Sequence, residues 1–333
     1  MTEPHTLVYS RVGDLDIHID LYLPPPTPEP EVPLIPAVIF FHGGGMFRGN
    51  RKSILPEFKD QVISKGWAFI SADYRLLLPC TGHDILQDIT ALFTYISTSL
   101  STSVNTHRVD PSRLFVSGHS GGAYVARQAA LHGTPKPKAF FSLSGQGGEL
   151  LMPQYFIPKT NIEKKMLGIY RKYSNPESTE FSTLKPCSDD PRIWRSSEDV
   201  HTSPGSRAFL LNMATLASTQ LDFLTGKPGL CSTIRSAYTT DSDVDISTLI
   251  PDDVKILFPE LWITASFPPS FIVHGTGDKS VLLRESEKTA GDLARCGVEC
   301  AVVWVDNWGH GYNPGIYERW VKDVIPFFQR QID

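Results

Sequence analysis

Short apolar runs alternate with longer segments of helical periodicity along most of this chain. The apolar runs are continuous, as in buried strands, and they occupy residues 37–41, 67–72, 114–117, 139–143, 271–273 and 300–305. Apolar residues recur at helical spacing over residues 54–65, 84–100, 121–132, 282–296 and 316–330. This alternation predicts an α/β fold with a mostly parallel central sheet and helices on both of its faces.

The first 36 residues carry a different pattern. Residues 6–11 and 15–23 alternate apolar and polar positions around Gly13-Asp14, which predicts a β-hairpin. A proline-rich run follows from Pro24 to Pro36. Because proline has no amide hydrogen to donate to a strand ladder, we expect this run to be a surface connection.

The segment 149–266 interrupts the alternation of strands and helices. It holds roughly a hundred residues where a crossover between parallel strands needs a few tens at most. Apolar residues recur at helical spacing from Ile162 to Tyr173 and from Leu210 to Leu224. We therefore predict a core formed by residues 1–148 and 267–333, with 149–266 inserted as a helical cap. The cap aromatics either line an acyl pocket or pack the cap on the core; they are Tyr170, Trp194, Phe209, Phe223 and Trp262.

Composition narrows the class of protein. A net charge of −5 gives no electrostatic reason to expect nucleic acid or an acidic membrane as a partner. Met1 to Ser10 lacks the apolar stretch of a secretory signal, and no apolar run is long enough to span a bilayer. The five cysteines are scattered, as is typical of free thiols in a reducing compartment. We expect a cytoplasmic protein; the sequence does not indicate its oligomeric state.

Two glycine-rich motifs follow predicted strands. Gly118-His119-Ser120-Gly121-Gly122 lies between the strand 114–117 and the helix 121–132. Small residues around a serine permit a sharp strand-to-helix turn that presents the hydroxyl as a nucleophile. His42-Gly43-Gly44-Gly45 ends the strand 37–41, and Gly49 follows four residues later. Amides of this run, with the amide of Gly121, are candidate donors to the oxyanion of a tetrahedral intermediate.

An acid and a histidine complete the constellation. Asp278 follows the strand 271–273, and His310 follows the strand 300–305. Because the carboxyl ends of parallel strands meet at one edge of a sheet, we expect both side chains near Ser120. Asp306 is a competing acid, but we expect it to support the loop that carries His310. His42, His119 and His274 are expected to be structural.

These motifs together resemble the α/β-hydrolase superfamily and, within it, the hormone-sensitive-lipase-like carboxylesterases. The segment Asp73-Tyr74-Arg75-Leu76 is similar to a YRL segment of that family, although the glutamate that follows it there is missing here. The resemblance implies an α/β-hydrolase fold with Ser120 as nucleophile, His310 as proton acceptor and donor, and Asp278 as the residue that orients His310. It assigns the oxyanion hole to the amides of Gly44, Gly45 and Gly121.

The implied activity is hydrolysis of a small-molecule carboxylic ester through an acyl-enzyme, with no metal and no organic cofactor. The same triad would serve a lactonase, a thioesterase, a formamidase, or an acyltransferase or cyclase. An alternative of a different class is a non-catalytic small-molecule binding protein on the same fold.

Overall fold

The structure is a computed structural model that describes residues 3–26, 32–102, 107–159, 207–310 and 314–333. The described residues form an eight-stranded sheet in the order β1-β2-β4-β3-β5-β6-β7-β8. β2 is antiparallel to β1 and β4, whereas all the other neighbours are parallel. The prediction of a mostly parallel sheet that begins with a hairpin is therefore confirmed. The strands are β1 His5–Val12, β2 Leu15–Tyr22, β3 Leu34–Phe41, β4 Ala68–Ala72, β5 Arg108–His119, β6 Ala139–Leu143, β7 Ser270–Gly275 and β8 Cys300–Val305.

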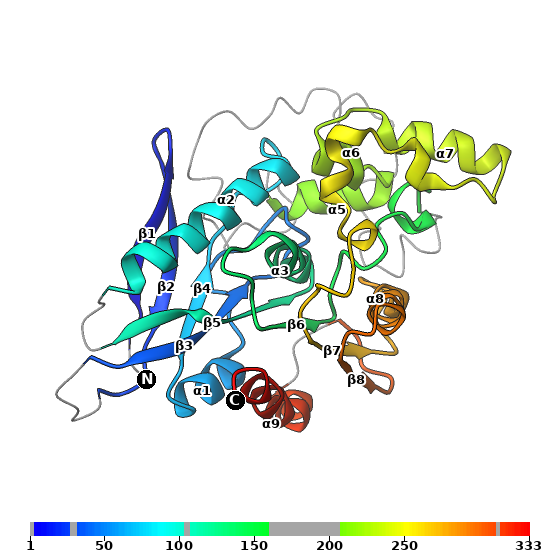
Figure 1. Cartoon of the computed structure of the whole chain (residues 1–333). Coiled ribbons are helices and arrows are strands. Elements are labelled where there is room, and N and C mark those ends of the chain that lie inside the picture. The colour runs from blue at the N-terminus through cyan, green and yellow to red at the C-terminus, as the bar shows by residue number, and fades with distance from the viewer. Residues whose placement is uncertain (1–2, 27–31, 103–106, 160–206, 311–313) are drawn as a thin grey trace.

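Helices cover both faces of the sheet (Figure 1). α2 (Gly82–Tyr95), α3 (Gly121–His132) and α8 (Leu283–Arg295) pack on one face, and a short π-helical turn, Ile96–Leu100, extends α2. α1 (Pro56–Ser64) and α9 (Pro314–Arg330) pack on the other face. Two apolar cores therefore lie on either side of strands whose side chains are almost entirely buried.

The expectation that the proline-rich connection continues to Pro36 is wrong at its end. β3 already begins at Leu34, which pairs with Arg108 at the start of β5. The register between these strands shifts between Ile35 and Ala37. Pro36 lies at this irregularity, where a missing amide hydrogen does not break a regular ladder.

The described part of the insertion is helical. It contains the short turn Pro153–Tyr155 and the helices α5 (Arg207–Ala217), α6 (Gln220–Thr225) and α7 (Leu230–Thr240), which lie together beyond α3 (Figure 1). Three 3₁₀ turns follow, at Ile246–Leu249, Asp252–Leu257 and Pro259–Leu261. The helical periodicity between Leu210 and Leu224 is thus confirmed, and the stretch 162–173 lies outside the described residues. The division into a core and a cap stays a prediction.

Side chains of α3 fasten this insertion to the core. The Tyr124 hydroxyl donates to the Leu257 carbonyl at 3.0 Å, and the Gln128 amide donates to the Ile256 carbonyl at 3.1 Å. Both side chains are fully buried.

Among the described residues, no helix combines the length and the apolar character needed to cross a bilayer.

A substitution at Phe115 can test the packing of the core on the face of the sheet that α1 and α9 cover. Its ring is stacked between Trp67, at 5.1 Å, and Phe328, at 4.5 Å between centroids, and the side chain is fully buried. Phe115→Ala is expected to lower the free energy of unfolding by about 3–5 kcal/mol, because it removes both contacts and leaves a cavity. The half-exposed Val302→Ala is the control and is expected to cost less than about 1 kcal/mol in the same urea titration. Equal losses for the two variants would contradict this description of the core.

Candidate active site

Ser120 stands at the junction of β5 and α3 in a backbone conformation that non-glycine residues seldom adopt, with φ 55° and ψ −126°. The turn is tight because neighbouring backbones approach each other closely. A Cβ atom on Gly122 would lie 2.1 Å from the Phe41 carbonyl oxygen, and one on Gly118 would lie 2.2 Å from the Gly122 carbonyl oxygen. The strand-to-helix turn predicted from the serine motif is therefore confirmed.

Ser120, His310 and Asp278 form one hydrogen-bonded chain. The Ser120 Oγ lies 2.8 Å from His310 Nε2, and His310 Nδ1 lies 2.7 Å from Asp278 Oδ2. An ionised carboxylate can only accept, so His310 donates from Nδ1, and Nε2 is left to accept from the serine hydroxyl. The structure brings together the three residues that the sequence predicts, and their catalytic roles stay a prediction.

The Asp278 carboxylate is buried and heavily hydrogen-bonded. Its Oδ1 accepts from the amides of Ser280, at 2.8 Å, and Val281, at 3.0 Å. Burial alone would raise the pKa of Asp278. The hydrogen bonds from His274, His310 and the Val281 amide outweigh burial and hold this pKa well below its usual range. Asp278 is therefore ionised at neutral pH and can stabilise a protonated His310.

Asp306 is not the partner of His310. The residue is exposed, and it makes no hydrogen bond to His310 in the part of the chain that the structure describes. The loop between them is instead fastened by the Asn307 amide, which donates to Thr276 Oγ1 at 2.9 Å.

Two further histidines have the structural surroundings expected of them. His274 is fully buried, with Nδ1 2.7 Å from Ser286 Oγ and Nε2 3.0 Å from the Val281 carbonyl oxygen. His119 stacks on His310 with 5.4 Å between ring centroids. Burial, with the neighbouring His310, lowers the pKa of His119 to about 3, so this ring stays neutral beside His310.

The glycine loop after β3 lies directly against the serine turn. Gly44 has φ 110° and Gly45 has φ 61°, and the Gly44 carbonyl accepts from the amides of Phe47 and Arg48, both at 3.1 Å. A Cβ atom on Gly121 would lie 2.6 Å from the Gly45 nitrogen. The amides of Gly44, Gly45 and Gly121 donate to no carbonyl among the described residues. Their role as an oxyanion hole stays a prediction.

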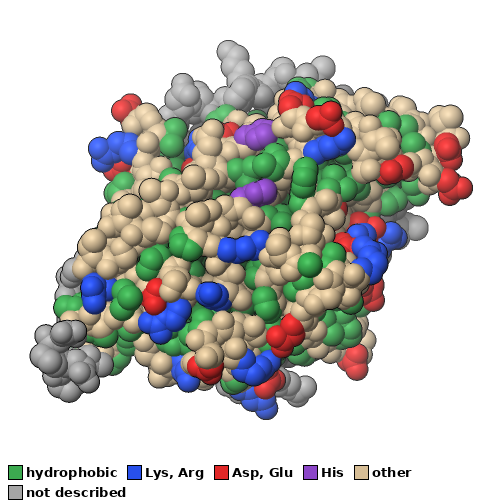
Figure 2. Space-filling view, viewed as in Figure 1, with side chains coloured by type: hydrophobic (Ala, Val, Ile, Leu, Met, Phe, Trp, Pro, Cys, Tyr) green, Lys and Arg blue, Asp and Glu red, His purple; other side chains and the backbone are tan. Residues whose placement is uncertain are grey.

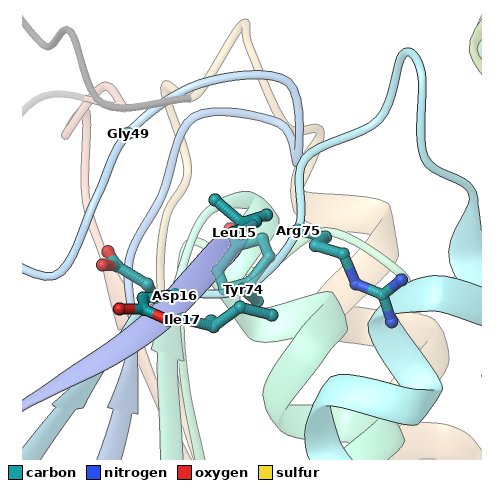
Figure 3. A pocket seen from close by; sticks show the side chains of 7 residues that line it. Leu15, Asp16, Ile17, Gly49, Tyr74 and Arg75 are labelled. Atoms are coloured by element: carbon teal, nitrogen blue, oxygen red, sulfur yellow. The ribbon is translucent and has the colours of Figure 1, made fainter. Parts of the chain in front are cut away.

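The segment 73–76 supports this loop from behind. The Tyr74 ring stacks on His42 at 4.4 Å, and its hydroxyl donates to the His42 carbonyl at 2.8 Å. Asp73 accepts from the Arg51 amide at 2.7 Å and from its guanidinium at 2.8 Å. Tyr74 and Gly49 also border a small hollow beside β2 (Figure 3). His42 thus has a structural role, as expected. Arg51 also supports this loop, and the sequence analysis had assigned it no role.

Arg75 faces away from the glycine loop, toward α2 (Figure 3). Its Nε donates to Asp88 at 2.8 Å, and its NH1 group donates to Asp84 at 2.7 Å. Arg75 and Asp88 are both buried, and this pair joins the segment 73–76 to the helix. The pair therefore has a structural role.

A cavity of about 640 Å³ opens over Ser120 and His310. Its wall combines polar and apolar surface. Core segments contribute Gly43, Gly44, Gly45, Arg48, Gly49, Ser53, Ile54, Leu55, His119, Gln146, Lys279, Ser280 and Val281, and the insertion contributes Gln154, Tyr155, Lys159, Leu211, Asn212, Thr215 and Gln220. Helices α5 and α6 of the insertion thus border the same cavity as Ser120.

Of the two roles expected for the aromatics of the insertion, pocket lining is excluded at both positions that can be judged, and packing on the core is confirmed for Phe223. Phe223 packs edge-on against Phe47 at 5.6 Å, and Trp262 is 46% exposed with its Nε1 donating to the Lys255 carbonyl at 2.8 Å. Neither residue lines the cavity. Phe223 is held by packing and Trp262 by a hydrogen bond, and periodicity alone does not distinguish either position from a pocket wall. Tyr170 and Trp194 lie outside the described residues, as does the side chain of Phe209.

Glu285 holds one wall of the cavity, although nothing in the sequence distinguishes it. This fully buried carboxylate accepts from the amides of Gly147, at 2.6 Å, and Gly148, at 2.8 Å, and from the Tyr155 hydroxyl. The Gln154 amide donates to it at 3.4 Å. A glutamate in the first turn of an amphipathic helix is normally solvent-facing, so sequence reasoning passes over it.

Across the described residues, no three histidine, cysteine, aspartate or glutamate side chains lie close enough to hold a metal ion. Asp241 and Asp245 accept from nearby backbone amides, which accounts for that acidic stretch as turn and cap residues.

Comparison with known proteins agrees with this fold. A family model described as BD-FAE matches residues 19–151, which include the glycine loop and the serine turn. An esterase of the Planctomycetes species Thermogutta terrifontis, solved with butyrate bound, superposes with a TM-score of 0.59 at 16% identity, over 98% of this chain and 94% of its own. A Staphylococcus aureus protein of unknown function superposes with a TM-score of 0.63 at 16% identity, over 98% of both chains.

Curated relatives include much longer proteins. Methylphloroacetophenone synthase of Cladonia uncialis is 26% identical over 92% of this chain, and the non-reducing polyketide synthase Preu6 of Preussia isomera is 31% identical over 92%. The chain spans only 12% and 14% of the length of these two synthases. A probable carboxylesterase, M8 of a Phoma species, is 31% identical over 40% of this chain and 45% of its own. The chain has the α/β-hydrolase fold, and its motifs resemble those of hormone-sensitive-lipase-like carboxylesterases.

Proposed function

We propose that this protein is a serine hydrolase that cleaves a small-molecule carboxylic ester through an acyl-enzyme intermediate. The observation that carries the proposal is the hydrogen-bonded chain from Ser120 through His310 to Asp278 at the floor of a large cavity. Each link has the length that proton transfer and orientation require. A non-catalytic binding protein on the same fold has no use for this alignment.

The proposed reaction begins when Ser120 Oγ attacks the carbonyl carbon and passes its proton to His310 Nε2. The ionised Asp278 stabilises the imidazolium, and the amides of Gly44, Gly45 and Gly121 donate to the oxyanion. Collapse of the intermediate breaks the bond to the alcohol, which leaves with the proton from His310. Water then attacks the acyl group and gives a proton to His310. Collapse of this second intermediate breaks the bond to Ser120 Oγ, which takes the proton back from His310 as the acid is released.

A second candidate keeps the same residues and changes the acyl donor or acceptor. The matches to polyketide synthases over 92% of this chain favour it. A polyketide is built as an acyl chain, and a serine that accepts an acyl group from an ester can accept one from a thioester. Release to water would make a thioesterase, whereas release to another nucleophile would make an acyltransferase or cyclase. Rates on matched oxygen and sulfur esters of one acyl group, with and without an added alcohol acceptor, separate these activities.

Replacement of the nucleophile tests the proposal directly. Ser120→Ala is expected to reduce turnover of p-nitrophenyl butyrate by about a thousandfold or more, because no other group can form the acyl-enzyme. The same change should abolish covalent labelling by a fluorophosphonate. Ser64→Ala, at an exposed serine near the end of α1, is the control and should behave as wild type.

Labelling that persists in Ser120→Ala, or activity above a tenth of the wild-type value, would refute the proposed mechanism. A wild-type protein that is neither labelled nor active on any ester, thioester, lactone or formamide would instead favour the non-catalytic alternative.

The acid can be tested by comparing two aspartates. Asp278→Asn is expected to lower kcat by roughly a thousandfold, because an amide can no longer both fix the tautomer of His310 and stabilise its positive charge. Asp306→Asn, at an exposed position, should lose less than about threefold. Steady-state kinetics on p-nitrophenyl butyrate supply both values, and the reverse ranking would assign the acid to Asp306.

A further inference from the structure

Leu211 of helix α5 stands against the glycine loop that follows β3. The three atoms nearest to a Cβ built on Gly45 would all belong to Leu211, with Cδ1 at 2.6 Å. A side chain at residue 45 would therefore collide with Leu211. A Cβ on Gly121 would in turn lie 2.6 Å from the Gly45 nitrogen, and Gly121 directly follows Ser120. Leu211 therefore packs on a residue that itself contacts the serine turn.

The rest of α5 fixes the place of Leu211. Leu210 and Ala214 are buried in the apolar core on the face of the sheet that α3 covers. Just beyond the C-terminal end of α5, the Ser218 hydroxyl donates to the Ile157 carbonyl at 2.7 Å. The helix is therefore held both along its length and at its end, and Leu211 forms a fixed part of the cavity wall.

Leu211 is also the one aliphatic side chain among the described insertion residues that line the cavity, because the others there carry a polar or charged group. Core segments add Ile54, Leu55 and Val281. By contrast, the outer face drawn in Figure 2 mixes apolar side chains with charged side chains of both signs. An apolar part of a substrate therefore has hydrocarbon partners at definite positions inside the cavity, and Leu211 supplies the one that packs on Gly45.

The proposed reaction indicates which part of the substrate comes near Leu211. In that reaction the oxyanion faces the amides of Gly44, Gly45 and Gly121, and the leaving group faces His310 Nε2, which gives it a proton. The acyl chain is the remaining substituent of the carbonyl carbon. It therefore leaves the reaction centre away from His310, beside the loop that would bind the oxyanion.

The distances bring the acyl chain close to Leu211. An oxyanion about 3 Å from the Gly45 nitrogen places the first carbon of the acyl chain within roughly 5–6 Å of that nitrogen. Leu211 Cδ1 lies within about 5 Å of the same nitrogen, because it is 2.6 Å from the Cβ position of Gly45. A methyl branch on that first carbon would therefore approach Leu211.

We infer that Leu211 limits the width of the acyl group next to the carbonyl, so that the natural substrate is unbranched at the carbon atom that follows the carbonyl. This inference rests on the proposed function, since it names the substrate class of the same site. A branch there would have to displace Leu211 or the glycine loop, and well-packed groups resist such displacement. The length of the acyl chain is restricted less, because the cavity has a volume of about 640 Å³.

Two isomeric substrates test the inference by steady-state kinetics. p-Nitrophenyl isobutyrate and p-nitrophenyl butyrate contain the same atoms and share a leaving group, but only the isobutyrate is branched next to the carbonyl. Leu211→Ala is expected to raise the isobutyrate-to-butyrate ratio of kcat/KM by about tenfold over the wild type, because it opens space for the branch. Leu211→Val, a smaller change, is expected to raise this ratio by roughly threefold, and it decides the inference if Leu211→Ala does not fold.

The same insertion offers a matched control. Leu261 is exposed and lies outside the cavity, so Leu261→Ala is expected to keep the wild-type ratio. A second pair of substrates, p-nitrophenyl butyrate and 2-methyl-4-nitrophenyl butyrate, varies the leaving group by one methyl and keeps the acyl group. Leu211→Ala is expected to change the ratio of kcat/KM for this pair by less than about twofold, because the leaving group faces His310 instead.

The outcomes separate the inference from the proposed function. Turnover with an unchanged isobutyrate-to-butyrate ratio in both Leu211 variants would overturn the inference and leave the serine hydrolase intact. An equal rise of this ratio in Leu261→Ala, or a change confined to the leaving-group pair, would overturn the inference as well. Absence of turnover of every ester by the wild-type protein would count against the proposed function, and the inference would fall with it.

Discussion

The structure depends on the close contact between the first turn of α3 and the end of β3. A side chain at Gly122 would collide with the carbonyls of Phe41 and His42, and one at Gly121 would collide with the backbone of Gly45. This contact brings the serine, the glycine loop and the free amides of a helix N-terminus into one small volume. A helix N-terminus favours negative charge, so under the proposed mechanism these amides would stabilise the oxyanion.

Residues outside this contact hold the glycine loop after β3 in place and bring the other predicted catalytic residues to Ser120. His42 is clamped by Tyr74, and the loop beyond it is tied down where Arg51 meets Asp73. His310 and Asp278 reach Ser120 from the ends of β8 and β7, where the parallel order of the strands delivers them to one edge. The core therefore supplies the reactive groups, while much of the cavity wall comes from the insertion.

Sequence reasoning predicted the core well because buried parallel strands are continuously apolar and their carboxyl ends meet. Ser120, Asp278 and His310 were predicted together for that reason. Sequence reasoning failed where the surroundings of a side chain depend on packing between segments that lie far apart in the chain. Glu285 looks like a surface residue of an amphipathic helix, yet it is fully buried. The sequence left Phe223 between lining a pocket and packing on the core, and the structure places it against Phe47.

The hydrogen bonds of Glu285 bear on how such proteins can be recombined. One carboxylate accepts both from the loop after β6 and from Tyr155. Phe156 next to it is fully buried within the apolar core. The first residues of the insertion are therefore structurally inseparable from the core, whatever their place in the sequence. A chimera that exchanges insertions between relatives preserves this wall only if the junction lies beyond Phe156 rather than at residue 149.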